Sequence, residues 1–240
     1  METALYLLPN RLSESGQSPW LDHQGLRELV TGLDGLFIES ERGAGRFLHA
    51  LGVSRHIRNY PVWFLPDLLK PDRLQQAIAS VKQGERWGVV SDAGYPGVAD
   101  PGAEIVRMAH IQSWKVVPFP GPSSIILSLA ATGLNGQRFL FQGYLTRKST
   151  DRIPVLQALE RESAARNLTQ IFIEAPHRNQ DMLSDCLRGL QPETWLGIAT
   201  DLTGQNESIR SRQIHDWKKA QWKADDSLPA IFLIQARPES

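Results

Sequence analysis

The sequence has a single cysteine, no net charge and no long apolar run, and each shortage excludes a class of protein. Cys186 alone rules out an internal disulfide and a cysteine-based zinc site. No apolar run reaches the roughly 20 residues of a membrane-spanning helix, and the acidic start Met1-Glu2-Thr3 is unlike a signal peptide. These features predict a soluble cytoplasmic protein with no membrane partner.

Charge and residue spacing narrow the expected ligands further. The 26 Lys and Arg residues balance 26 Asp and Glu residues, so binding of nucleic acid would depend on local patches. The six histidines are scattered without metal-binding spacing, so no metal site is expected. There is no P-loop, and the pair Gly43-x-Gly45 lacks the third glycine of a dinucleotide-binding turn.

Hydrophobic patterning predicts two α/β domains, residues 1–119 and 120–240. In the first, short apolar strands alternate with amphipathic helices, which indicates an open, mostly parallel sheet. Pro120-Gly121-Pro122 has the composition of a linker. The predicted strands are 4–8, 36–39, 61–64, 87–90, 115–119, 139–144, 170–174, 195–199 and 231–234.

The most informative segment runs from Ser91 to Gly102, between a predicted strand and a predicted helix. Its three glycines and two prolines indicate a tightly shaped loop. Asp92 would lie at the carboxyl end of the strand, where open α/β sheets bind ligands. Asp100, followed by Pro101, is expected to cap the next helix. A rigid turn without a ligand is the alternative.

A second turn, Pro120 to Ser124, follows the last strand of the first domain. In a parallel sheet it would open on the same edge as the Asp92 loop. Its backbone N–H groups and the hydroxyls of Ser123 and Ser124 suit a ligand with carboxylate, ribose or amino groups. Capping of a helix is the simpler role for one serine. No serine or thiol nucleophile motif is present, which disfavours acyl transfer.

These two turns resemble the signature turns of the tetrapyrrole methylase-like class of S-adenosylmethionine-dependent methyltransferases. Further segments are similar to the branch of this class that methylates a ribose 2′-hydroxyl of small-subunit ribosomal RNA, in the same order along almost the whole chain. They are 39–48, 139–152 with Gly143-Tyr144-Leu145-Thr146-Arg147-Lys148, Glu174-Ala175-Pro176-His177-Arg178, and 200–207. The resemblance implies two α/β domains with a cofactor cleft between them, S-adenosylmethionine as cofactor, ribosomal RNA as partner and a homodimer.

The resemblance also implies which residues form the site. Glu39, Arg42 and Asp92 would assist the reaction, in which an aligned ribose hydroxyl attacks the sulfonium methyl carbon and loses its proton. Arg147, Lys148 and Arg178 would bind RNA phosphates. The cofactor contacts implied by position are Leu8, Pro9, Asp92, Ala93, Gly94, Tyr95, Ser123, Ser124, Ala175, Ala199 and Pro229.

Several of these residues also have simpler roles. Glu39 can cap a helix or pair with Arg42 or Arg46. The Arg147-Lys148 pair can be a solvated loop, and His177 is more often a turn histidine than a catalytic base.

The sequence departs from the branch at a few positions, most of them outside the cofactor turns. The segment Pro9–Leu12 matches only in part. The other departures are Ser40, Glu41, Tyr95 and Gly204. Two alternative functions therefore stay open: a methyltransferase of the same fold that acts on a small molecule or a protein, and a catalytically silent module that binds nucleotide or RNA.

Overall fold

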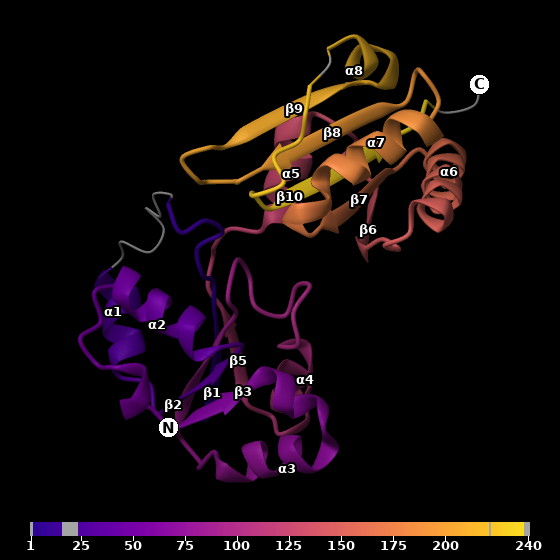
Figure 1. Ribbon diagram of the computed structural model, residues 1–240. Helices are drawn as coiled ribbons and strands as arrows, with labels where there is room; N and C mark the ends of the chain where they lie inside the picture. Colours follow the sequence, from indigo (N-terminus) through magenta and orange to yellow (C-terminus); the bar gives the residue numbers. More distant parts are fainter. Residues whose placement is uncertain (1, 16–23, 221, 238–240) are drawn as a thin grey trace. The chain divides into compact units, whose positions relative to one another are not determined.

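A computed structural model of the chain describes residues 2–15, 24–220 and 222–237 (Figure 1). The chain divides into two compact units, Met1–Ser123 and Ser124–Ser240, a few residues after the boundary expected from sequence. Each unit contains one five-stranded sheet with helices, so the predicted α/β class is confirmed. Among the described residues, no helix has the length and apolar character needed to cross a membrane.

The sheet of the first unit is parallel throughout, with the strand order β3-β2-β4-β1-β5. Val90 is paired with both Leu8 and Ile38, so β1, β2 and β4 end together at one edge. The predicted open parallel sheet is therefore confirmed. The strands are β1 (Ala4–Leu8), β2 (Gly35–Ile38), β3 (Val62–Phe64), β4 (Arg86–Val90) and β5 (Lys115–Pro118).

Helices cover both faces of this sheet (Figure 1). Because successive strand residues point to opposite faces, Ile38 packs with Phe47 of α2 while Phe37 packs in the cluster containing Ile105 of α4. The apolar clusters on the two faces fix the strands whose carboxyl ends carry the loops. The helices are α1 (Gln24–Thr31), α2 (Glu41–Ala50), α3 (Pro71–Ser80) and α4 (Ala103–Ile111), with 3₁₀ turns η2 (Ile57–Asn59) and η3 (Leu65–Leu69).

The second unit has a mixed sheet with the strand order β6-β7-β10-β8-β9. Strand β6 is parallel to β7, whereas β10 is antiparallel to both β7 and β8. The strands are β6 (Phe139–Tyr144), β7 (Thr169–Glu174), β8 (Trp195–Thr200), β9 (Ser208–Gln213) and β10 (Ala230–Gln235). The helices are α5 (Ser124–Thr132), α6 (Ser149–Arg166), α7 (Asn179–Gly189) and α8 (Ile214–Ala220), with the 3₁₀ turn η4 (Pro176–Arg178).

The core of the second unit contains the only cysteine of the sequence. The rings of Phe172 and Phe232 stack with centroids 5.8 Å apart, and Cys186 of α7 is fully buried in the same cluster. Burial raises the pKa of the Cys186 thiol well above its usual range, because the thiolate would lose its hydration. Cys186 is therefore a small apolar core residue.

The start of α4 corrects one prediction. The sequence predicts Asp100 as the N-cap, but Gly102 occupies that position and no side chain caps the helix. Asp100 Oδ1 instead accepts hydrogen bonds from the N–H groups of Gly97 (2.6 Å) and Gly102 (2.7 Å). The Asp100 carboxylate thus stabilises the loop before the helix. Its hydrogen bonds go to the loop N–H groups of Gly97 and Gly102, so it does not act as the N-cap.

Candidate functional site

Three loops meet at the carboxyl edge of the first sheet, after β1, β4 and β5. The Asn10 N–H donates to the carbonyl of Gly94 (2.8 Å), and the Gly94 N–H donates to the carbonyl of Arg11 (3.3 Å). A Cβ added to Gly121 would lie 2.1 Å from Cγ of Pro9. Strand β1 lies between β4 and β5 in the sheet, which is why its end touches both other loops.

The backbone of the Asp92 loop requires glycine at two positions. Gly94 and Gly97 have φ values of +69° and +82°, in the left-handed region that side chains disfavour. Within the described chain, the N–H groups of Ala93 and Tyr95 have no hydrogen-bond acceptor. The loop therefore presents two backbone donors close to the end of β1.

A cluster of polar groups fixes Asp92 at the end of β4. Its N–H donates to Oε2 of Glu39 (2.8 Å), and its Oδ1 accepts from the Ser40 hydroxyl (2.7 Å). The Ser40 hydroxyl also accepts from the Gly43 N–H (3.0 Å), as the N-cap of α2. Ser40, not Glu39, therefore caps the helix, and Glu39 receives the loop.

Glu39 lies in an environment that favours its protonated form. Burial raises its pKa, the hydrogen bond from the Asp92 N–H partly opposes this, and the carboxylates of Asp92 and Asp100 raise it further. A carboxylate with a raised pKa accepts a proton more readily near neutral pH. Glu39 is thus the group in this cluster best suited to receive a proton.

Two residues that the sequence analysis did not select hold this cluster together. The Asn10 side chain is buried, and its Nδ2 donates to the carbonyls of Ser91 (2.9 Å), Asp92 (3.3 Å) and Gly43 (3.4 Å). A Cβ on Gly43 would lie 1.9 Å from Oδ1 of Asp92. The only sequence signal for Gly43 is its position three residues after Ser40, the N-cap of α2.

A pocket of about 910 Å³ opens beside this cluster within the first unit. Asp92 and Ala93 lie at its wall, and Arg42 of α2 extends along it with 81% of its side chain exposed. Neither Arg42 nor Arg46 pairs with Glu39, because both contact the carboxylate of Glu14. The structure thus brings Arg42 and Asp92 to one pocket.

Leu8 and the two serines complete the first-sheet candidates. Leu8 is fully buried in the core against α1 and α2, so only its backbone faces the edge. Ser123 and Ser124 are half-buried, and within the described residues neither hydroxyl has a hydrogen-bond partner.

In the second unit, three predicted positions share one sheet edge. Ala230, the first residue of β10, is paired with Glu174 at the end of β7 and with Thr200 at the end of β8. Ala175, Ala199 and Pro229 are the chain neighbours of these three residues. Ala199 is fully buried, whereas Pro229 is exposed and its carbonyl accepts from the Asp201 N–H (3.0 Å).

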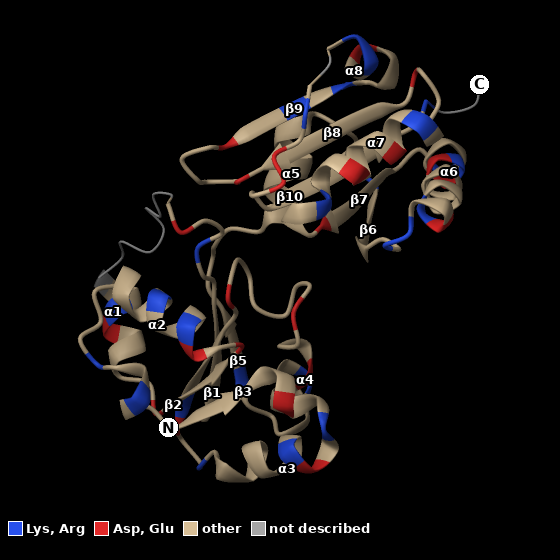
Figure 2. Ribbon diagram, in the orientation of Figure 1, with Lys and Arg blue, Asp and Glu red and all other residues tan. Residues whose placement is uncertain are grey.

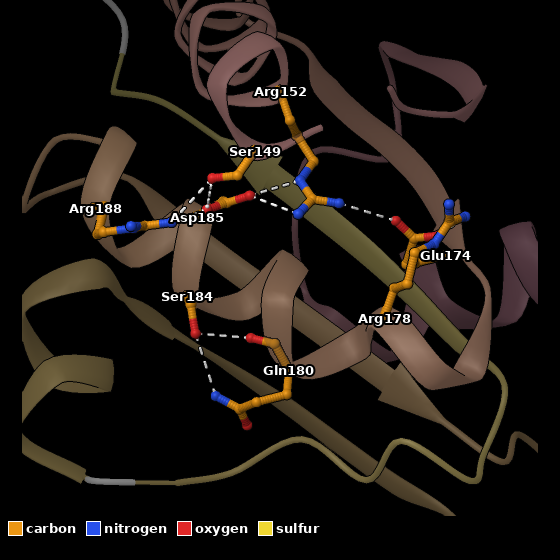
Figure 3. A network of polar contacts seen from close by, with 8 residues as sticks. All are labelled: Ser149, Arg152, Glu174, Arg178, Gln180, Ser184, Asp185 and Arg188. Carbon is orange, nitrogen blue, oxygen red and sulfur yellow. Dashed lines mark hydrogen bonds and ion pairs between the residues drawn. The ribbon is translucent and has the colours of Figure 1, made fainter. Parts of the chain in front are cut away.

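A buried ionic network lies behind this edge (Figure 3). Arg152 of α6 contacts Asp185 of α7 (2.6 Å) and Glu174 (3.4 Å), with only 2% of its side chain exposed. Burial alone would raise the pKa of Asp185, but hydrogen bonds from Ser149, Arg188 and Arg152 hold it below its usual range. The network ties α6, α7 and β7 to one another.

The basic residues predicted to bind RNA differ in their exposure and in whether they form ion pairs within the protein. Arg147 and Lys148 are exposed just before α6. Arg178 forms an ion pair with Glu174, whose Oε1 also accepts from the Ala175 N–H (2.7 Å). His177 is exposed in η4. Arg178 is therefore engaged within the protein, whereas Arg147 and Lys148 face solvent.

Comparison with known proteins finds related sequences, although no family model matches. Ribosomal RNA small subunit methyltransferase I of Escherichia coli O157:H7 is 30% identical over 210 residues, 88% of this chain and 69% of that protein. The protein of the same name from Vibrio cholerae is 30% identical over 222 residues, 92% of this chain and 72% of its own. That from Pseudomonas aeruginosa is 38% identical, covering 58% of this chain and 49% of its own.

Solved structures share the fold at low sequence identity. Uroporphyrin-III C-methyltransferase from Thermus thermophilus superposes with a TM-score of 0.53 at 13% identity, over 97% of this chain and 94% of that chain. Precorrin-6Y methylase from Archaeoglobus fulgidus gives 0.50 at 14% identity, over 98% and 97%. These structures share the fold alone. The sequence relationships show that the chain belongs to the ribosomal RNA small subunit methyltransferase I family, a family of S-adenosylmethionine-dependent methyltransferases.

Proposed function

We propose that this chain binds S-adenosylmethionine at the Asp92 loop and transfers its methyl group to a ribose 2′-hydroxyl of small-subunit ribosomal RNA. The observation that carries the proposal is the meeting of Pro9, the turn 92–95 and Gly121 at one sheet edge. The names of the relatives support RNA as the acceptor.

The residues of the loop fit this cofactor, which carries a carboxylate, an amino group and ribose hydroxyls and supplies an electrophilic methyl group. The unpaired N–H groups of Ala93 and Tyr95 suit a carboxylate or a hydroxyl. The half-buried carboxylate of Asp92 suits an amino or hydroxyl donor. We assign further contacts to Ser123 and to the second-unit positions. Those positions are Ala175, Ala199 and Pro229.

The reaction needs the acceptor hydroxyl to be aligned and its proton to be removed. We assign proton acceptance to Glu39, because burial raises its pKa. The hydrogen bond from the Asp92 N–H to Oε2 also holds the Glu39 carboxyl group beside the Asp92 loop. Asp92 would orient the reactants, and Arg42 would offset the negative charge of a nearby phosphate.

RNA contacts are proposed for the exposed pair Arg147 and Lys148. Arg178 would act on the site by positioning the Ala175 segment, since Glu174 holds both. We further propose that the protein works in the cytoplasm and forms a homodimer. Light scattering of the purified chain tests the homodimer through its molar mass.

Labelled S-adenosylmethionine tests the proposal. The protein would be incubated with small ribosomal subunits that lack the modification, and with total protein and metabolite extracts as competing acceptors. Label in RNA at positions that resist alkaline cleavage is the expected result, because a 2′-O-methyl group blocks the attacking hydroxyl. Label in protein or small molecules alone would assign the enzyme to another acceptor. Calorimetry showing cofactor binding without any transfer would indicate a silent binding module.

A further inference from the structure

The pocket beside Asp92 has an unusual concentration of basic side chains for a chain without net charge. It lies between the segment that follows β1, helix α2 and the turn η2. Figure 2 shows Lys and Arg positions in blue along the ribbon of α2. Its basic residues are Arg11, Arg42, Arg46, His49, His56 and Arg58, against the acidic Glu14, Glu41 and Asp92.

Two arginines of this pocket, Arg11 and Arg58, lack the structural partners that other arginines of the unit have. Arg27 donates to the Leu51 carbonyl (2.6 Å) and Arg86 to the Gly32 carbonyl (2.7 Å), so these side chains hold the fold. By contrast, Nε of Arg11 is buried without a hydrogen-bond partner. Arg58 is exposed and forms no ion pair with any residue that the structure describes. These guanidinium groups are available to a ligand.

One carboxylate of the chain, that of Glu14, contacts two arginines of this pocket. Glu14 pairs with Arg46 and lies 3.8 Å from Arg42. All three side chains are substantially exposed, so the pairs contribute little to folding stability. Glu14 therefore occupies an anion position that an incoming ligand can take over at low cost.

The spacing of the basic groups favours an extended polyanion over a single small anion. Arg42, Arg46 and His49 follow one face of α2 at intervals of four and three residues. With a rise of about 1.5 Å per residue, they span roughly 10 Å along the helix. Guanidinium groups bind phosphates in bidentate geometry, and a row of them suits successive phosphates of one strand.

We propose that this pocket binds the phosphate backbone of the RNA acceptor next to the Asp92 loop, with Glu14 competing for the same arginines. The inference rests on the proposed function, since it takes RNA as the acceptor. It extends the proposed phosphate contacts of the first unit beyond Arg42 and assigns such contacts to Arg11, Arg46 and Arg58, which the family resemblance did not indicate. Glu14 would weaken nonspecific binding of other anions.

Binding of a short fluorescein-labelled single-stranded RNA, followed by anisotropy at several salt concentrations, tests the pocket. The double variant Arg46→Ala, Arg58→Ala should weaken binding about tenfold or more and reduce the salt slope by about 0.7 per lost contact. Glu14→Gln should tighten binding. Arg73→Ala on α3 is the matched control, because Arg73 is exposed but lies outside the pocket lining.

The two proposals fail in distinguishable ways. If the wild type methylates RNA but the double variant binds RNA as Arg73→Ala does, the pocket proposal is overturned and the methyltransferase stands. If pocket variants lose RNA binding but no acceptor is ever methylated, the pocket stands and the proposed activity fails. Displacement of RNA by equal concentrations of inorganic phosphate, or better displacement by polyglutamate than by unlabelled RNA, would also overturn RNA as the occupant.

Discussion

Single side chains and single glycines hold the candidate site in place. The Asn10 amide reaches carbonyls of two segments, one of them 81 residues away in the sequence. Gly43 leaves space for the Asp92 carboxylate at the start of α2. Both roles depend on long-range contacts, and sequence spacing alone does not show which residues meet. That is why sequence patterns indicate Asp92 as a candidate but do not reveal that Asn10 and Gly43 contact its loop.

Gly43→Ala should disable the site while the fold survives. The new Cβ would lie 1.9 Å from Oδ1 of Asp92, so Asp92 or the start of α2 must move. A displacement of about 1 Å in a catalytic group can reduce turnover about a hundredfold. Calorimetry with S-adenosylmethionine and a transfer assay measure the loss.

Gly45→Ala is the matched control, on the same helix and with no atom within 4 Å of the added Cβ. It should stabilise the protein by about 0.4–1 kcal/mol through the unfolded chain and leave cofactor affinity unchanged. Equal cofactor affinity in the two variants would show that the contact between Gly43 and Asp92 does not matter for binding.

Glu39→Gln should stabilise the folded protein at neutral pH. A raised pKa in the folded state means that the ionised form is disfavoured there. The stabilisation from Glu39 is therefore complete below its unfolded pKa and is lost as pH rises through its folded pKa. Gln keeps an oxygen for the Asp92 N–H and removes the charge.

Urea denaturation of both proteins at neutral and acidic pH measures this difference. The advantage of Glu39→Gln should be largest above the folded pKa and disappear below the unfolded one. An advantage that persists at acidic pH would argue against desolvation of the charge. If Glu39 is the proton acceptor, methyl transfer should fall at all pH values while cofactor binding remains.

At the scale of elements, the sequence predicts best where burial is two-sided. Strands β1 and β4 are short apolar runs and are central in a parallel sheet, so their pattern is clear. Strand β9 was missed, because it is an edge strand with Ile209 as its only large apolar residue. Helix α8, at seven residues, is too short for a clear helical period.

The buried network between α6, β7 and α7 should respond unequally to loss of Arg152 and loss of Arg188 (Figure 3). Arg152→Ala removes the one buried cation between Glu174 and Asp185, so that only Arg178 and Arg188 still contact these two buried carboxylates, and it should cost about 3–5 kcal/mol. Arg188 contacts the same Asp185 but has 63% of its side chain exposed, so Arg188→Ala should cost at most about 1 kcal/mol.

Free energies of unfolding from urea titrations compare the two variants. Similar losses of unfolding free energy in the two variants would mean that burial does not determine how much each arginine contributes to stability. Cofactor affinity adds a second readout, because Glu174 also holds the N–H of Ala175. Arg152→Ala should weaken cofactor binding if the Ala175 segment contributes to the site.

For the whole molecule, the sequence indicated two α/β parts and the family, whereas details of capping and pairing came from the structure. The Asp-Pro pattern at Asp100 wrongly predicted a helix cap. An aspartate before a proline often caps a helix, but here the Asp100 carboxylate accepts hydrogen bonds from the N–H groups of Gly97 and Gly102. Likewise, the basic pocket combines residues 11, 42–49 and 56–58, which no local pattern unites.

Each unit has a core of its own, so destabilisation should stay within the unit that is changed. Hydrogen exchange should show that Arg152→Ala lowers amide protection in β8 and β10 much more than in β1 and β4. Gly43→Ala should give the opposite pattern. Loss of protection across all four strands in either variant would mean that the chain unfolds as one cooperative unit.

The burial of Cys186 has a practical consequence for these experiments. We expect its thiol to react slowly with maleimides while the protein is folded, because the reaction requires an accessible thiolate. One cysteine introduced at an exposed position, for example Arg73→Cys, would therefore accept a dye at a single known site without removal of the native residue. The unmodified sequence can therefore serve as the starting protein for site-specific labelling.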